Sequence, residues 1–395
     1  MNDPSGAPRT PRQAQASLLS RSWKELVHNP LPVIGWLIFL VLIFLMLRNL
    51  LPQGQQPAAY SPEQFLRQLL FGLAQGSIYA MLALGYTMVY SVLSIIHFAH
   101  GEVFMAGAYA GFFALSATAH SGLLATDPFL SVLLTLLAGI GVAILLALLM
   151  ERFVYRPVRE SPPVVSLIVA VGASLVVQQA FARLFGADAR RYPTVNLLAF
   201  PWLFPRFGCD ATGTDCRGID LISGRYDVSF LGFNLRLLPI HAVVIAAALI
   251  FMLVLWFYVA RTNAGRALRA VAEDRAVAVL MGVDANRAIV RVFVLGGVLA
   301  GAAGVLYAFY NHQVSPFVGF LPGVKGLTAA MLGGIGSVPG AVLGGLLLGV
   351  VEAIAPSLLG MSAQIKDLLV FGILVLVLLF RPGGVFGENM AEKGV

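Results

Sequence analysis

The sequence predicts an all-α fold. We expect a polytopic integral membrane protein with about eight core transmembrane helices, one extra N-terminal helix and a Gly-rich broken or re-entrant segment. The 395 residues are 58% hydrophobic and only 11% charged, against roughly 25% charged residues in a soluble domain. The net charge of +7 fits cytoplasmic loops rich in Lys and Arg, so binding to a lipid bilayer and not to nucleic acid is expected.

Apolar runs long enough to cross about 30 Å of hydrocarbon follow one another along the chain. The first, at residues 31–47, has no A-x-A-like cleavage site, so residues 31–64 are expected to form a retained anchor and linker. The Gly-rich stretch 321–354 is expected to hold a short segment near 326–334 and a span at 337–354. The other core spans are expected at residues 65–95, 102–118, 129–150, 164–182, 239–260, 290–310 and 365–380.

Arginine-rich loops predict the orientation in the membrane. The short loops 151–160 and 261–291 and the tail from Arg381 carry the basic residues, so all three are expected in the cytoplasm. Counting the crossings places loop 186–238 in the periplasm. Residues 1–30 are then expected to be a disordered basic cytoplasmic tail, and residues 388–395 a second cytoplasmic tail.

The printed sequence holds few groups for chemistry. Cys209 and Cys216 lie in the predicted periplasmic loop, where they form either a small disulfide or two free thiols. No Cys/His cluster has metal spacing, so no metal site is expected. No GxxxxGK[ST] motif occurs, so ATP must be bound by a separate polypeptide.

A polar stripe marks the second apolar run. Gly72, Gln75, Tyr79, Tyr86 and Tyr90 fall within an arc of about 60° on a helix. Polar groups in hydrocarbon need partners or water, so the stripe is expected to face a translocation path. Ordinary helix packing with satisfied hydroxyl groups is the alternative.

A polar kink follows this run at the predicted inner surface. A metal site at His97 and His100 is not expected, because no further ligand is near. A structural turn is expected instead, with His100 in it, Gly101 breaking the chain and Glu102 capping the next helix.

Glycine dominates the stretch between residues 324 and 354. Pro339 in a Gly-Ser-Val-Pro-Gly turn predicts a broken helix, which a bilayer tolerates only where it is buried or lines a cavity. The alternative is tight helix packing without substrate contact. The expected structural positions are Gly333, Gly334, Gly336, Pro339 and Gly340.

Charged residues are scarce within the predicted spans. Glu352 is expected near the outer surface, in an interfacial role. Carriers driven by protons or sodium usually hold acidic or His side chains in the path, so energy is expected from outside the bilayer. The loop 261–291, with six arginines and three acids, is predicted to form one or two short amphipathic helices that an external motor grips.

Four stretches carry a family resemblance. The first stretch begins with GLAQGSIYAMLALGYTMVYSVL at Gly72, and the second is RALRAVAEDRAVAVLMGVDANR at Arg266. The third begins with GLTAAMLGGIGSVPGAVLGG at Gly326, and the fourth is RPGGVFG at Arg381. Together they resemble the LivH-type permease subunit of bacterial branched-chain amino acid ABC importers, over residues 65–387. The resemblance implies a LivM-type sister permease, two cytoplasmic ABC ATPases that hold ATP and Mg, and a periplasmic substrate-binding protein. No cofactor is then bound by this chain.

The resemblance also assigns the coupling loop. Arg269, Ala272, Glu273, Asp274 and Gly282 match the cytoplasmic segment by which such permeases dock on their ATPases. A solvated helix face is the alternative for the two acids. His97 departs from the family, which usually has Asn there.

We therefore expect a permease subunit, and not an enzyme, that forms half of the path for leucine, isoleucine and valine or related small amino acids. A urea or short-amide importer remains open, since specificity in such systems rests mainly on the binding protein. A secondary carrier or channel is a distant alternative, set aside for its missing embedded charge. A membrane-bound transferase would need a catalytic cluster that the sequence does not offer.

Overall fold

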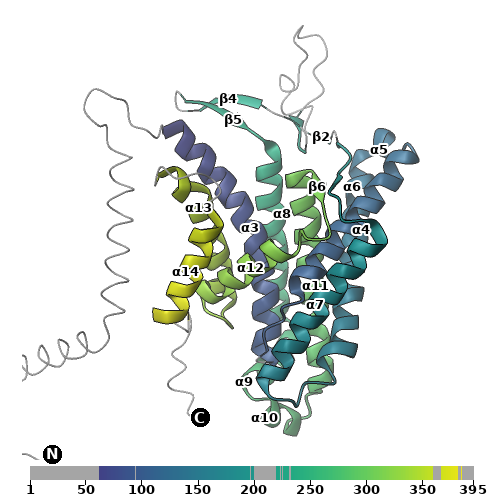
Figure 1. Cartoon of the computed structure of the whole chain (residues 1–395), viewed down its shortest axis with the longest axis vertical. Coiled ribbons are helices and arrows are strands. Elements are labelled where there is room, and N and C mark those ends of the chain that lie inside the picture. Colours follow the sequence, from purple (N-terminus) through teal and green to yellow (C-terminus); the bar gives the residue numbers. More distant parts are fainter. Residues whose placement is uncertain are drawn as a thin grey trace, which may run out of the picture. The chain divides into compact units, whose positions relative to one another are not determined.

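The computed structural model describes residues 62–93, 95–195, 197–199, 219–222, 224, 226–230, 233–358, 366–380 and 384. Within these ranges, seven helices are long and apolar enough to cross a membrane. The predicted anchor at 31–47, the two tails and both cysteines lie outside the described residues. Figure 1 shows the long helices packed as a bundle. The all-α, polytopic prediction is confirmed.

The helices match the predicted spans to within a few residues. The longest are α3 (Pro62–Leu93) and α11 (Ala285–Asn311), and α11 packs against α3, α4 and α6 in the middle of the bundle. The final turn of α6 continues as a π-helical turn, η1 (Met150–Tyr155), and a short α5 (Leu123–Thr126) precedes α6. The remaining long helices are α4 (His100–His120), α6 (Pro128–Leu149), α7 (Pro163–Phe185), α8 (Pro239–Arg261), α13 (Val338–Leu358) and α14 (Lys366–Phe380).

The Gly-rich region forms the predicted broken helix. Its first part, α12 (Phe320–Gly333), has 14 residues and is about 21 Å long, too short to cross the hydrocarbon. Gly334 and Gly336 then take positive φ angles, and α13 begins with Pro339 in its first turn. Figure 1 shows α12 inside the bundle, where it packs against α3, α4 and α14. The chain therefore buries a half-helix among complete spans.

Short strands occupy the loops at one end of the bundle. β1 (Arg190–Arg191) pairs antiparallel with β6 (Gln313–Val314), with Arg190 opposite Val314. β2 (Leu198–Ala199) pairs with β3 (Ile219–Asp220), and β4 (Tyr226–Phe230) forms a hairpin with β5 (Phe233–Leu237). The loop predicted at 186–238 thus contains small antiparallel ladders and is tied through β1 to the loop after α11.

The kink before α4 differs from the prediction. The chain breaks at residues 95–99, while His100, Gly101 and Glu102 already belong to the buried first turn of α4. The rings of His100 and Tyr86 are 4.8 Å apart, and Tyr86 lies seven residues before the end of α3. Since seven helical residues rise about 10 Å, α4 begins inside the bundle and not at its inner surface.

Gly101 and Glu102 also act differently from the expectation. A Cβ atom on Gly101 would lie 2.5 Å from the carbonyl oxygen of Gly319, so this glycine permits a close backbone approach and does not break the chain. Glu102 is in the first turn of α4, near its positive end as expected, but it makes no capping hydrogen bond there: its Oε1 accepts from Ser174 Oγ of α7 at 3.1 Å. Both roles depend on contacts between distant segments, which the local pattern does not show.

Candidate functional site

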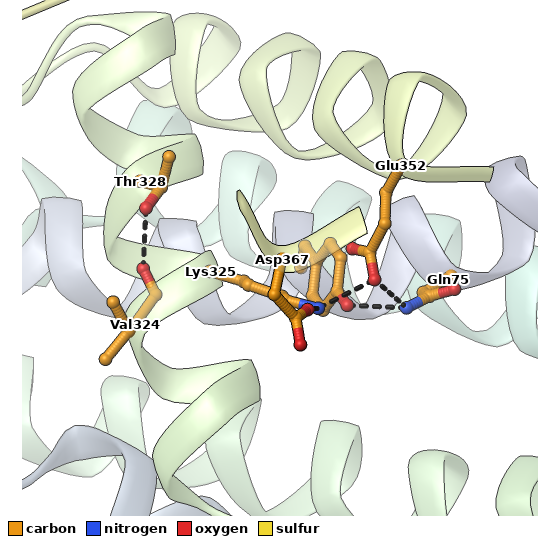
Figure 2. Close-up of polar contacts among 7 residues, drawn as sticks. Gln75, Val324, Lys325, Thr328, Glu352 and Asp367 are labelled. Atoms are coloured by element: carbon orange, nitrogen blue, oxygen red, sulfur yellow. Dashed lines mark hydrogen bonds and ion pairs between the residues drawn. The ribbon is translucent and has the colours of Figure 1, made fainter. Parts of the chain in front are cut away.

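The polar stripe in the N-terminal half of α3 contacts the Gly-rich region. Gln75 Nε2 donates hydrogen bonds to the Tyr79 hydroxyl at 2.6 Å and to Glu352 Oε1 at 3.1 Å. Figure 2 shows Gln75 and Glu352 converging on Lys325, which comes from α12. The stripe therefore ends in a site shared by α3, α12 and α13.

Lys325 lies at the centre of this site. Its Nζ is 2.7 Å from Glu352 Oε1 and 2.6 Å from Asp367 Oδ1 at the start of α14. Lys325 is 4% exposed and Glu352 3% exposed. We call Gln75, Tyr79, Lys325, Glu352 and Asp367 the ion cluster. The Lys325 ammonium group thus links α12, α13 and α14. A buried charge of this kind is stable only when it is paired.

The ion cluster corrects the expectation that embedded charge is scarce. Gln75 is 13 residues from the start of α3, or about 20 Å along an axis of 32 residues, and so lies near the helix midpoint. Glu352 is six residues before the end of α13 and shares Lys325 with Asp367 in the first turn of α14, so its expected place near the outer surface stays a prediction. The sequence did not reveal this buried cluster because Lys325, Glu352 and Asp367 stand apart along the chain.

Small residues let α13 reach α3. A Cβ atom on Gly72 would lie 2.8 Å from the Val350 Cα, and one on Gly349 would collide with the backbone of Gly76. The helices therefore touch backbone to backbone, as small residues spaced by four allow. This contact carries Glu352 to Gln75. On a neighbouring face, Gly340 makes the same kind of contact with Gly333 of α12.

The other two tyrosines of the stripe lie elsewhere. Tyr86 lines a small cavity between α3, α4, α7 and the start of α12. Tyr90 is half-buried near the end of α3. The structure thus brings Gln75 and Tyr79 together in the ion cluster and places Tyr86 at a separate cavity. Gln75, Tyr79, Tyr86 and Tyr90 do not line one shared cavity among the described residues.

The predicted coupling loop folds into two short helices. α9 (Asn263–Glu273) follows Thr262, whose Oγ1 accepts from Gly265 N at 3.0 Å. α10 (Arg275–Leu280) follows Asp274, whose Oδ1 accepts from Ala276 N at 2.8 Å and from Val277 N at 3.0 Å. Asp274 is therefore an N-cap that satisfies two free amide groups. Figure 1 shows α9 and α10 at the end of the bundle opposite the β4–β5 hairpin.

The remaining predicted coupling residues fall into two groups. Arg269 donates to the Val259 carbonyl and ties α9 to the end of α8. Gly282 has a φ of 82°, which L side chains rarely adopt, so it ends the turn after α10. Ala272 and Glu273 are exposed on α9. Arg269, Asp274 and Gly282 thus shape the loop, while Ala272 and Glu273 are on its surface.

An apolar surface on α10 escaped the sequence analysis. Leu280 is 85% exposed and Met281 80% exposed, with Val277 and Val279 also exposed beside them. We call these four residues the α10 knob. The run of apolar residues in this loop was the signal that could have revealed it. The helix has only six residues and buries only Ala278 among the described side chains, so its neighbouring apolar residues cannot all face the bundle. Neighbouring exposed apolar groups on a charged loop make the α10 knob a candidate contact surface.

A basic depression lies at the start of α11. A cavity of about 280 Å³ is lined by Arg156, Arg287 and Arg291, with Glu151 at its edge. Glu151 pairs with Arg159 at 2.8 Å. Burial lowers the pKa of the Arg159 guanidinium below its usual value, and the Glu151 carboxylate opposes this shift. The three arginines that line the cavity come from the two Arg-rich loops 151–160 and 261–291.

Comparison with known proteins identifies relatives along most of the chain. The family profile described as the branched-chain amino acid transport system permease component matches residues 68–378. The high-affinity branched-chain amino acid transport system permease protein BraD of Pseudomonas aeruginosa is 39% identical over 83% of this chain and 98% of its own length. LivH of Salmonella typhimurium, a permease protein of the same description, is 37% identical over 83% and 97%.

A more distant relative has another substrate in its name. The fructose import permease protein FrcC of Rhizobium meliloti is 28% identical over 62% of this chain and 70% of its own length. No solved structure matches the chain.

Proposed function

Because the chain belongs to the family of branched-chain amino acid transport system permease components, we propose that it forms half of the translocation path of an ATP-driven importer for leucine, isoleucine and valine. The observation that carries this proposal is the 39% identity to BraD across 98% of that relative. Identity over nearly a whole relative favours a shared substrate more than the partial likeness to a fructose permease does.

The proposed assembly supplies what this chain lacks. The printed sequence has no P-loop motif, so ATP and Mg belong to two cytoplasmic ABC ATPase subunits. A LivM-type sister permease forms the second half of the path, and a periplasmic binding protein delivers the substrate. The chain then lies in the bacterial inner membrane with both termini in the cytoplasm, because the Arg-rich loops face inward.

The α10 knob is the proposed contact with an ATPase. Leu280 and Met281 project from the end of the bundle and are solvated in the isolated chain, and they gain free energy when a partner covers them. Arg269, Asp274 and Gly282 hold the loop in shape, while Ala272 and Glu273 form the rim of the contact. A short helix tied to α8 and α11 passes ATPase movement into the bundle.

The α3 face is the proposed wall of the path. Tyr86 lines it at the cavity, with Tyr90 beyond it toward the cytoplasmic end. Gln75 and Tyr79 act differently, since Gln75 donates hydrogen bonds to Tyr79 and to Glu352 of α13 within the ion cluster.

Competition for uptake tests the substrate. In cells that express the chain with its partner subunits and binding protein, we expect unlabelled isoleucine or valine to abolish uptake of radiolabelled leucine. An excess of urea or acetamide should leave it unchanged, and deletion of the chain should reduce it to background. Competition by urea, with none by valine, would assign the chain to an amide importer and contradict the proposed substrate.

A further inference from the structure

One cavity opens where two helices begin inside the bundle. It has a volume of about 80 Å³ and lies between α3, α4, α7 and the start of α12. A single water needs only about 10–15 Å³ of such space, so the cavity can hold a larger group. Ser174, which lines it, is 11 residues from the start of α7, about 16 Å along the helix and near its midpoint. The cavity is therefore deep in the membrane.

A buried carboxylate with a free oxygen faces this cavity. Glu102 is 1% exposed and lines the cavity wall. Its Oε1 accepts from Ser174, but Oε2 has no hydrogen-bond partner among the described residues. A buried carboxylate oxygen without a donor is strongly unfavourable, so the site is complementary to a cationic donor.

The start of α12 forms another wall of the cavity. Gly319 and Phe320 line the cavity, and α12 begins there without a side-chain cap in the described part of the chain. Its first amide groups are already used: Phe320 N donates to the Phe317 carbonyl, Gly323 N donates to the Gly319 carbonyl, and Pro322 has no N–H group. Gly101 and Gly319 touch through their backbones, which holds this helix start beside Glu102.

Aliphatic side chains complete the cavity. Val171 and Leu175 of α7 face it from one side, and Val324 and Leu327 of α12 from the other. Lys325 is on the far face of α12, since one residue turns the helix by about 100°. The cavity and the ion cluster therefore lie on two sides of the same half-helix, so the ion cluster fixes one cavity wall.

We propose that this cavity is a binding position for an aliphatic α-amino acid during its passage through the membrane. Glu102 Oε2 accepts a hydrogen bond from the substrate ammonium group, and the Val and Leu side chains contact the aliphatic group. The inference rests on the proposed function and adds to it the groups that recognise the substrate.

Photo-labelling of the assembled transporter tests this site. The probe is a leucine analogue with a diazirine in its side chain, applied together with the binding protein and ATP. We expect labels on α7 and α12 at Val171, Leu175, Val324 or Leu327, removed by excess leucine. Glu102→Gln should lower both labelling and leucine uptake by about tenfold or more, the effect of losing a hydrogen bond to a charged group.

Two further variants keep the test decisive. Thr87→Val removes another buried hydroxyl without a partner, one residue from Tyr86 and outside the cavity lining, and should leave labelling unchanged. Leu175→Phe fills the cavity from the exposed helix α7 and should block labelling even if the Glu102 variant fails to fold. Leucine uptake by the wild type with no label at the cavity would overturn this site and leave the proposed function standing. Absence of leucine uptake by the wild type would overturn both.

Discussion

Replacing Lys325 with methionine is expected to destabilise the folded chain by about 3–5 kcal/mol. The substitution removes the ammonium group that lies 2.7 Å from Glu352 and 2.6 Å from Asp367. Two carboxylates then remain beside each other, and Glu352 is only 3% exposed. Removing one charge of a buried ion pair lowers the free energy of unfolding far more than removing both charges, because the remaining charge is left unpaired.

The loss is measured as the free energy of unfolding in mixed detergent micelles. Lys366→Met is the matched control, because Lys366 is exposed at the start of α14 and should change stability by less than about 0.5 kcal/mol. The triple variant Lys325→Met, Glu352→Gln, Asp367→Asn should recover most of the loss, since no charge is left unpaired. A triple variant as unstable as the single one would show that the ion cluster does not act through its charges.

Replacing Leu280 with aspartate is expected to detach the ATPase subunits while the chain still inserts in the membrane. Leu280 is 85% exposed, so the substitution removes no packing within this chain. At an interface it replaces a buried apolar contact by a desolvated charge. We expect at least about 2 kcal/mol of lost binding, roughly thirtyfold in Kd, with uptake falling in parallel. The measurement is co-purification of the ATPases with the tagged chain.

Two control variants separate the apolar surface from the shape of the loop. Leu280→Met keeps an apolar side chain and should bind the ATPases normally. Asp274→Ser keeps an N-cap acceptor without the charge, so binding should persist if Asp274 serves as the cap of α10. Normal co-purification of the aspartate variant would place the docking surface elsewhere on the chain.

The helices could be predicted because each carries its own signal. A run of about 20 apolar residues has few other solutions in a protein this hydrophobic. The broken helix was also accessible, since Gly334, Gly336 and Pro339 are local stop and start signals that α12 and α13 obey. Both kinds of signal depend on neighbours along the chain.

The sites were harder to predict because they join distant segments. Lys325 meets Glu352 from 27 residues away, and neither residue indicates the other in the sequence. Gly101 resembles a chain break until Gly319 is placed against it. The stripe on α3 was identified correctly as a set of residues on one face, yet Gln75 and Tyr86 lie at different sites.

The sequence analysis inferred an energy source outside the bilayer because it found little charge within the spans. The buried charges remove that argument. A secondary carrier was set aside for its missing embedded charge, whereas Lys325, Glu352 and Glu102 are all buried within the bundle. Membership of the permease family now carries the distinction instead. A buried charge paired across helices stabilises the fold equally well in an importer and in a carrier.

Leucine uptake by reconstituted vesicles tests the central claim most directly. The vesicles hold this chain, its sister permease and the ATPases, with the binding protein on the side opposite the ATPases. We predict that leucine accumulates only when ATP is supplied on the ATPase side, and that ionophores which collapse proton and sodium gradients leave the rate unchanged. Accumulation that follows an imposed gradient without ATP, and stops when the ionophores are added, would contradict the account.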